Sequence, residues 1–454
     1  MMKQVSLLFV VFINATILFG QVPKGDRILA WQVDMAENNN YDSAFAYAKV
    51  ACMESIHLSY TWGLLEDSFN VFNTTYMNAT LSVADIYYPA NGMKVELQIA
   101  PLNTGTLEVP ADLETNNFDD QVMIDRFKTL LDTIFSRIPN LELSALNIGN
   151  EHDVNFGIDV AQYDAYKVFL DSVIPYAKQL YFNLHSSDLK VGTTFTLHSL
   201  TNPLTSALCQ SVNAACDIIT TTYYPLNPDF TMQTPSAVFT DFNDLTAIYN
   251  DPNVPIYFAE CGYSSSSVCN SSEQLQATFY KNVFEAWDTH YDQIKYLTLF
   301  KTTDWSQSDV DLLSQYYGLG NNTEFKEYLR ALGVRTFPGN GSNKAAYLQI
   351  LCELSNRNWC QVTCPPLSIE NVDNSDGLKL NIYPNPCDQY FSIQSADNDI
   401  VMQVELFDRS GRKIRSLSSI AVDSKIDISY LMSSVYLVRI TSEEKVLIKK
   451  LIVD

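Results

Sequence analysis

The chain has 454 residues, of which 46% are apolar and 18% are charged, and its formal net charge is −23. This length predicts two or three folded domains, and the ordinary apolar content excludes a disordered chain. The acidic excess argues against nucleic acid or an anionic membrane as a partner, because both are bound through Lys and Arg.

The first residues have the composition of a secretory signal. Lys3 precedes an apolar run from Val5 to Phe19, and Gly20 lies at a plausible cleavage point. The run is too short to span a membrane, and no later stretch approaches the roughly 20 apolar residues of a transmembrane helix. We therefore expect a signal peptide at residues 1–20 and a secreted protein without a transmembrane anchor.

Nine cysteines are consistent with an oxidising compartment, and their odd number leaves at least one thiol unpaired. Short separations along the chain predict local disulfides. We expect one bridge between Cys209 and Cys216 and another between Cys261 and Cys269.

The other cysteines are less informative. The pairing of Cys352, Cys360 and Cys364 stays open, and we expect Cys52 to be a buried free thiol. A metal site is not expected, because the Cys360 and Cys364 pair has no matching pair of histidines.

Charge is distributed unevenly along the chain. Residues 373–454 contain 10 Lys or Arg and 12 Asp or Glu, whereas residues 22–372 contain 18 and 40. This contrast indicates two domains with different surfaces. The Pro-, Asp- and Gly-rich stretch 364–377 lacks helical or strand periodicity. We therefore predict a large domain at 21–336, a Cys- and Pro-containing extension and linker at 337–377, and a last domain at 378–454.

In the large domain, short apolar or β-branched runs alternate with longer amphipathic stretches, which is typical of strands and helices around a parallel sheet. The runs lie at 28–33, 55–60, 94–100, 143–148, 189–195, 218–224, 255–259 and 294–300. Helical patterns lie between them, for example at 43–53, 119–138, 162–181, 273–290 and 324–332. These elements predict an α/β fold, the (β/α)8 TIM barrel. An open doubly wound sheet is the alternative, although no Gly-rich phosphate loop follows the first run.

The last domain has a different pattern. Alternating runs at 380–382, 401–407, 435–440 and 446–453 are separated by turn residues such as Ser410 and Gly411. This pattern predicts a small all-β sandwich.

Two acidic residues follow strands that face each other across the predicted barrel. Glu151 comes after the fourth run and Glu260 after the seventh. Functional groups of such barrels lie at the carboxyl ends of the strands. Hydrolysis of an acetal needs one carboxyl to protonate the departing oxygen and another to capture the oxocarbenium carbon. Helix capping or a surface ion pair would explain either residue alone, but the pair favours catalysis.

The segments around these acids resemble the catalytic motifs of the clan A glycoside hydrolases. Residues 148–153 and 258–264 are most similar to the endo-β-1,4-galactanase and β-glucanase type of barrel. The resemblance implies that Glu151 is the general acid/base, that Glu260 is the nucleophile and that Asn150 binds the sugar 2-hydroxyl. It also implies that Tyr224 hydrogen-bonds the nucleophile and that Trp305 forms the floor of the sugar site. Such an enzyme retains the anomeric configuration and needs no cofactor or metal.

Further aromatic and polar residues near predicted strand ends are candidates for sugar binding. An indole face stacks on the C–H face of a pyranose and leaves the sugar hydroxyls free. Trp62 and Trp31 are such candidates, although packing inside the barrel explains them as well. His152 and Asp153 could line the site or support Glu151.

The tail resembles the C-terminal sorting domain of type IX secretion. The matching segments are 380–386, 404–414, 435–440 and 449–454. The resemblance implies export through the type IX machinery, with release or attachment at the bacterial cell surface. A carbohydrate-binding sandwich is less favoured, because the tail contains no Trp.

Together these patterns predict a secreted retaining glycosidase that cleaves β-linked bonds of a poly- or oligosaccharide. The alternative is a non-catalytic cell-surface glycan-binding protein on the same barrel. The acid pair separates the two hypotheses, because a protein that only binds glycans needs no such pair.

Overall fold

The structure is a computed structural model that describes residues 22–364, 380–395, 401–408, 413–442 and 445–453. The described residues form two compact units, and the first consists of residues 22–364. The expected signal peptide at 1–20 and the last part of the expected extension and linker, residues 365–377, lie outside the described residues. Residues 337–364 of that expected extension belong to the first unit and contain the helix α14 (Ala345–Asn356).

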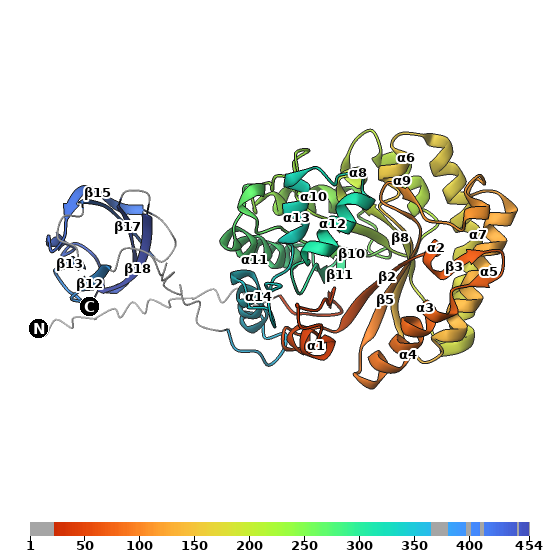
Figure 1. The fold of residues 1–454 in the computed structure, drawn as a ribbon, viewed down its shortest axis with the longest axis horizontal. Coiled ribbons are helices and arrows are strands. Elements are labelled where there is room, and N and C mark those ends of the chain that lie inside the picture. The colour runs from red at the N-terminus through yellow and green to blue at the C-terminus, as the bar shows by residue number, and fades with distance from the viewer. Residues whose placement is uncertain (1–21, 365–379, 396–400, 409–412, 443–444, 454) are drawn as a thin grey trace, which may run out of the picture. The chain divides into compact units, whose positions relative to one another are not determined.

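Within residues 22–364, eight parallel strands close into a barrel that helices surround (Figure 1). In ring order the strands are β1 (Ile28–Trp31), β2 (Ser55–Thr61), β5 (Lys94–Asn103), β7 (Leu143–Asn150), β8 (Val191–Thr196), β9 (Ile219–Tyr223), β10 (Ile256–Cys261) and β11 (Ile294–Leu299). The strand β1 pairs with both β11 and β2, and β2 pairs in turn with β5, which closes the ring. The predicted TIM barrel is therefore confirmed, and the open sheet is excluded.

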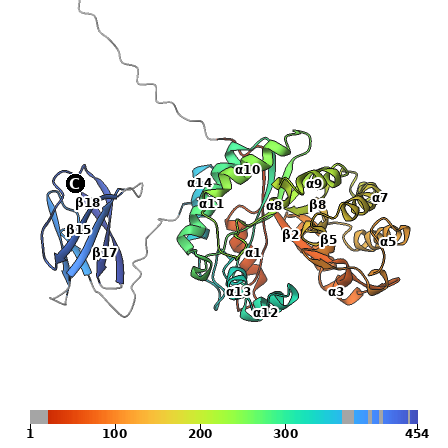
Figure 2. The ribbon, with the colours of Figure 1, turned by 90° about the horizontal axis from the view of Figure 1, so that it is seen from above.

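Helices cover the outside of the barrel, as the turned view also shows (Figure 2). They are α1 (Tyr41–Val50), α3 (Thr74–Ala79), α4 (Leu81–Ala90), α5 (Gln121–Arg137), α7 (Val160–His185), α9 (Ser206–Asn213), α10 (Ala237–Ile248), α11 (Glu273–Thr289) and α14 (Ala345–Asn356). The helix α5 is typical, because Met123, Phe127 and Leu131 recur at helical spacing and are buried. Side-chain caps set helix starts, as where Ser272 accepts a hydrogen bond from the Leu275 amide before α11.

The remaining elements of this unit lie in the connections. They are α2 (Trp62–Leu65), β3 (Glu66–Ser68), β4 (Val71–Phe72), β6 (Thr106–Leu107), η1 (Ala111–Leu113), α6 (Asp153–Phe156), α8 (Leu197–Thr201), η2 (Ser267–Cys269), α12 (Gln307–Tyr316) and α13 (Thr323–Arg330). The strand β6 runs antiparallel to the end of β5 and forms a hairpin with it. The helices α12 and α13 are inserted between β11 and α14.

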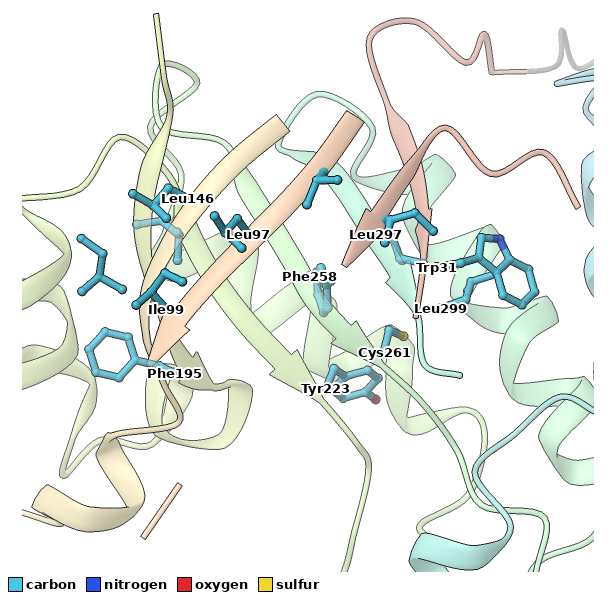
Figure 3. Close-up of a cluster of buried hydrophobic side chains, with 14 of the residues drawn as sticks. Trp31, Leu97, Ile99, Leu146, Phe195, Tyr223, Phe258, Cys261, Leu297 and Leu299 are labelled. Carbon is cyan, nitrogen blue, oxygen red and sulfur yellow. The ribbon is translucent and has the colours of Figure 1, made fainter. Parts of the chain in front are cut away.

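Apolar strand residues pack against the helices and form the large core. Figure 3 shows part of this cluster, in which Leu97, Leu146 and Phe258 come from different strands and are completely buried. Alternate residues of the same strands point the other way, because side chains in a strand alternate between its two faces. These alternate positions are unusually polar and include the buried residues His57, Glu96, Gln98, Asn147 and Thr220.

The predicted disulfides are wrong. In the described part of the chain, the bridges are Cys52–Cys360 and Cys352–Cys364. Their Cα atoms lie 6.0 and 4.1 Å apart, although the first pair is separated by 308 residues in sequence. The Cys52 side chain is therefore not a free thiol.

The four cysteines of the expected pairs are thiols instead. The Cys209 thiol donates to the Ser199 carbonyl, and the Cys269 thiol donates to the Glu324 carbonyl. A disulfide depends on the distance and direction of the two side chains, and a short chain separation does not guarantee either.

The second unit is a small all-β domain, as predicted. Its strands in the described ranges are β12 (Leu380–Tyr383), β13 (Tyr390–Ser395), β14 (Val401–Phe407), β15 (Lys413–Ala421), β16 (Ile426–Asp427), β17 (Ser434–Ser442) and β18 (Lys445–Val453). They pair antiparallel in two sheets, β12-β13-β16 and β15-β14-β17-β18. Buried side chains such as Phe391, Val404 and Val438 share one core.

Candidate active site

Glu151 directly follows β7, at the carboxyl end of the barrel. Its amide donates a 2.8 Å hydrogen bond to the Thr194 carbonyl of β8, and its backbone has a left-handed φ of 45°. The preceding Gly149 has a φ of 95°, and a Cβ at this position would lie 2.3 Å from the Tyr166 hydroxyl. Only glycine therefore fits this turn, which directs the chain from the strand into the Glu151 position.

Two threonine hydroxyls bind the Glu151 carboxyl group. Thr222 Oγ1 donates to Oε1 over 2.6 Å, and Thr104 Oγ1 donates to Oε2 over 2.8 Å. Burial and, to a lesser extent, the negative charge of Glu260 together raise the pKa of Glu151 to about 7. A group with this pKa is partly protonated at neutral pH, so it can act as a general acid.

Glu260 lies near the end of β10, where the register with β9 shifts after Phe258 and brings Glu260 opposite Thr222. The Tyr224 hydroxyl donates a 2.6 Å hydrogen bond to Glu260 Oε2. Gly262 makes room for this tyrosine, since a Cβ there would lie 2.6 Å from the Tyr224 ring. The structure thus contains the hydrogen bond from Tyr224 to Glu260 that the family resemblance implied.

The electrostatic surroundings of Glu260 differ from those of Glu151. Burial raises the Glu260 pKa, whereas the nearby His57 and the hydrogen bond from Tyr224 lower it. Glu151 has no cationic neighbour among the causes that act on its pKa. The pair therefore takes up its first proton on Glu151 and leaves Glu260 as the carboxylate.

A buried polar network inside the barrel supplies the charge near Glu260. His57 Nδ1 bonds to one oxygen of Glu96, and the Asn147 amide donates to the other. Thr220 donates to the Asn147 carbonyl oxygen over 2.9 Å. Burial opposes a charged His57, but the Glu96 carboxylate outweighs it and raises the pKa of the imidazole. These residues carry no motif in the sequence and were missed.

Asn150 lies beside the acid pair. Its Nδ2 donates to Asn103 Oδ1 over 3.0 Å, and its own Oδ1 is buried without a hydrogen-bond partner. A buried carbonyl oxygen without a donor is costly. A sugar hydroxyl would satisfy it, which agrees with the role that the family resemblance implies.

His152 and Asp153 do not lie among the groups that contact the acid pair. The His152 ring is completely buried against Tyr166 and Phe195, and burial lowers its pKa to about 3. Asp153 accepts hydrogen bonds from the amide and hydroxyl of Thr196. Both side chains are thus buried in the loop after β7, and the Asp153 charge raises the pKa of Glu151.

The three tryptophans have different positions. Trp305 follows β11 and is half-buried, and the Lys301 ammonium lies over its ring. Trp62 is completely buried, donates to Glu66 Oε2 over 2.8 Å and packs edge-on against Phe127. It belongs to the core and cannot stack on a sugar.

Trp31 is also buried in the core. Its ring contacts Tyr347 of α14, 6.4 Å between centroids, so it points from β1 toward the helices. Figure 3 shows the indole beyond its strand, apart from Phe258 and Leu97. Successive residues of a strand face opposite sides of the sheet. A shift of one position along β1 would therefore place a tryptophan inside the barrel and not in the core against the helices.

Several aromatic groups near the acids come from the insertion after β11. The Tyr328 ring of α13 contacts the Tyr224 ring, with centroids 5.9 Å apart. Burial, and then the charges of Glu151 and Glu260, raise the pKa of Tyr328. Tyr317 experiences the same two charges. The sequence analysis missed both threonines that donate to Glu151. Thr222 lies in the run 218–224, which was predicted as a strand, whereas Thr104 lies beyond the run 94–100.

A cation site is a further possibility at such a cluster of acids. In the part of the chain that the structure describes, no group of three or more His, Cys, Asp or Glu side chains is arranged to bind a metal ion.

Comparison with solved structures identifies the barrel fold. The exo-β-1,4-mannosidase Op5Man5 from Opitutaceae bacterium strain TAV5 superposes with a TM-score of 0.54 at 12% identity over 73% of this chain. A GH5_18 protein from Bifidobacterium longum subsp. infantis gives a TM-score of 0.52 at 12% identity over 73% of this chain. One from Bifidobacterium longum subsp. longum in complex with Manβ1-4GlcNAc gives 0.53 at 11% identity over 75%.

The matched part covers 60% of the mannosidase and 79% and 80% of the two GH5_18 proteins. At such low identity these similarities show the fold. The search of curated proteins found no match.

The second unit matches a sequence family. The model of the secretion system C-terminal sorting domain matches residues 381–454. Within the described ranges, no helix combines the length and the apolar composition needed to cross a membrane. The chain therefore joins a (β/α)8 barrel, similar in fold to these solved structures, to a secretion system C-terminal sorting domain, which indicates secretion and attachment at the cell surface.

Proposed function

We propose that the protein is an exported retaining glycoside hydrolase that cleaves β-linked bonds in a poly- or oligosaccharide. One observation carries this proposal: two half-buried carboxyl groups lie at the ends of β7 and β10, with different hydrogen-bond donors and a mutual electrostatic effect. In the described part of the chain neither carboxyl group forms a salt bridge that would explain its position, whereas glycoside hydrolysis requires such a pair.

The two carboxyl groups have different roles. Protonated Glu151 donates its proton to the oxygen of the departing sugar while the Glu260 carboxylate attacks the anomeric carbon. This step breaks the glycosidic C–O bond and forms a glycosyl ester on Glu260. Glu151, now a carboxylate, removes a proton from a water molecule, whose oxygen attacks the same carbon and releases Glu260. Two inversions leave the configuration unchanged.

The local contacts support these roles. Tyr224 donates to Glu260 and stabilises the carboxylate that must attack. The Thr222 and Thr104 hydroxyls orient the Glu151 carboxyl group. Asn150 has a free amide oxygen for a sugar hydroxyl, and Trp305 presents a half-buried ring after β11.

The type IX secretion machinery is the second proposed partner, through residues 378–454. The match to the sorting-domain family supports this part of the proposal. The carbohydrate substrate would then be met outside the cell, where large glycans are accessible.

Activity of the purified protein tests the proposal. We would screen aryl β-glycosides of glucose, galactose, mannose and xylose, together with plant and microbial β-glycans. Mannosides belong in the screen because structurally similar proteins include a mannosidase. We expect hydrolysis by the unchanged protein, and a loss of at least about 10³-fold in Glu151→Gln and in Glu260→Gln.

Glu142→Gln is the matched control, because Glu142 precedes β7 at the opposite end of the barrel and is exposed. It should retain full activity. Binding of a glycan without hydrolysis by the unchanged protein would instead support the alternative, a non-catalytic glycan-binding protein.

A further inference from the structure

The insertion between β11 and α14 has contacts that the catalytic proposal does not use. We call residues 307–330, which contain α12 and α13, the bridging segment. An ion pair between Lys326 and Asp311 connects its two helices. The segment therefore forms one unit, which contacts loops from distant parts of the barrel.

One end of the bridging segment contacts the loops after β9 and β10. The Phe325 ring of α13 packs on Phe230, with centroids 4.9 Å apart. The Glu324 carbonyl accepts a 3.3 Å hydrogen bond from the Cys269 thiol of η2. These contacts place α13 over the side of the mouth that carries Glu260.

The other end contacts the β5–β6 hairpin. The Tyr316 hydroxyl, at the end of α12, donates to Glu108 Oε1 over 2.5 Å. The same hydroxyl oxygen accepts a 3.2 Å hydrogen bond from Asn103 Nδ2. The strands β5 and β10 lie opposite each other in the ring. The bridging segment therefore crosses the mouth of the barrel from one side to the other.

The crossing lies directly at the acid pair. Thr104, next to Asn103 in the same hairpin, donates to Glu151, while Tyr328 of α13 contacts the tyrosine that donates to Glu260. Because the segment starts from β11, it separates the mouth over β11, β1 and β2 from the mouth over β7, β8 and β9.

We propose that the bridging segment, anchored by Tyr316 to Asn103 and Glu108, blocks one side of the sugar site and restricts cleavage to the ends of glycan chains. This inference rests on the proposed glycosidase activity and adds where in a chain the enzyme cuts. An endo-acting enzyme needs a groove that is open on both sides of the acids. Here one side is closed, so one chain end must lie against the segment.

Oligosaccharides blocked at a single end test this inference. The probes are β-1,4-linked gluco-, manno- and galacto-pentaoses, each made in two sets with a bulky group at either the reducing or the non-reducing end. With the sugar that the protein hydrolyses, we expect one set to be cut and the other to react at least about 100-fold more slowly. Products of one fixed size should appear from the earliest times.

Variants at the anchor provide a second test. Tyr316→Ala removes the whole ring, and Tyr316→Phe removes only the hydroxyl that contacts Glu108 and Asn103. Loss of a hydrogen bond to a carboxylate corresponds to about a tenfold change in the equilibrium between the anchored and the released bridging segment. Each should increase cleavage of the resistant set by about that factor. Tyr291→Ala is the control, because Tyr291 is similarly exposed, at 40% against 38%, but follows α11 outside the mouth.

The possible failures are distinguishable. Equal cleavage of both blocked sets by the unchanged protein, or random product sizes, would overturn the inference while leaving the glycosidase proposal intact. An unchanged preference in folded Tyr316→Phe and Tyr316→Ala would exclude this anchor as its cause. Absence of hydrolysis of every aryl glycoside and glycan would overturn the glycosidase proposal, and the inference with it.

Discussion

The hydroxyl of Thr222 donates a 2.6 Å hydrogen bond to Glu151 Oε1, although Glu151 follows a strand two places away in the barrel. Thr222 is also the register partner of Glu260 in the neighbouring strand. One residue of β9 thus lies between the two acids and contacts one of them directly. The geometry of the pair therefore depends on the closed barrel and not on flexible surface loops.

Rescue with azide tests the two assigned roles separately. In Glu260→Gly, azide can occupy the vacated space and attack the anomeric carbon, which gives a glycosyl azide of inverted configuration. In Glu151→Gly, azide should attack the glycosyl ester on Glu260 and give the retained product. Proton NMR of the products distinguishes the two anomers. A retaining pair should lie about 5–5.5 Å apart in a crystal structure, and a separation near 9 Å would contradict the mechanism.

The pH profile should change when the hydrogen bond to Glu260 is removed. Tyr224 lowers the Glu260 pKa, so in Tyr224→Phe this pKa rises and the acidic limb of kcat/KM moves to higher pH. We also expect kcat to fall by about 10- to 100-fold. Tyr223→Phe is the neighbouring control, because the Tyr223 hydroxyl donates to Asp241 instead. An unchanged acidic limb in Tyr224→Phe would disprove this coupling.

Glu151 should destabilise the fold at neutral and alkaline pH. Its pKa in the folded protein is about 7, above the ordinary value of 4.5, so the folded state binds the proton more tightly than the unfolded state. The contribution of Glu151 to the free energy of unfolding is fully present below a pH of about 4.5. It falls as the pH rises to about 7, and the total loss is about 3 kcal/mol. Glu151→Gln should therefore have a higher melting temperature at pH 8 and little change at pH 4. Calorimetry at the two pH values measures the difference, and an equal shift at both would contradict it.

The disulfide bridges should contribute unequally to stability. In the loop-entropy model, Cys352–Cys364 contributes about 3 kcal/mol and the much longer Cys52–Cys360 loop about 5–6 kcal/mol. Denaturant unfolding of Cys52→Ala/Cys360→Ala should thus show a larger loss than that of Cys352→Ala/Cys364→Ala. Peptide mapping without reduction should find these two bridges. A Cys209–Cys216 or Cys261–Cys269 peptide would contradict the structure.

Deletion of residues 373–454 should separate export from catalysis. The described part of the barrel unit has its own core, and the tail matches a sorting-domain family. We expect the truncated protein to remain inside the producing cell, yet to hydrolyse the same substrate at an unchanged rate once purified. Cell fractionation and an activity assay measure the two effects. A folded but inactive truncation would show that the tail takes part in catalysis.

Much of the fold followed from local patterns in the sequence. Each strand of the barrel is a short apolar or β-branched run, and helices such as α5 and α11 have a continuous amphipathic period. These patterns extend over few residues, so they can be recognised without knowledge of the rest of the chain. The positions of Glu151 and Glu260 at strand ends could be predicted for the same reason, because strand ends are visible in the sequence.

The environment of the acids could not be predicted in this way. His57 and Glu96 lie inside two strands, where one residue of offset decides whether a side chain enters the barrel or faces a helix. The same offset places Trp31 in the core. Tyr328 comes from an inserted helix, and no local pattern shows where that helix packs.

The sequence by itself determined the order of strands and helices, the two units, the sorting domain and the location of the acids at strand ends, because these are properties of consecutive residues. The tertiary structure decided the disulfide pairs, the burial of Trp62, the donors to each carboxyl group and the path of α12 and α13 across the mouth. All of these depend on distances between residues far apart in the chain, such as Cys52 and Cys360, which only the closed barrel brings together.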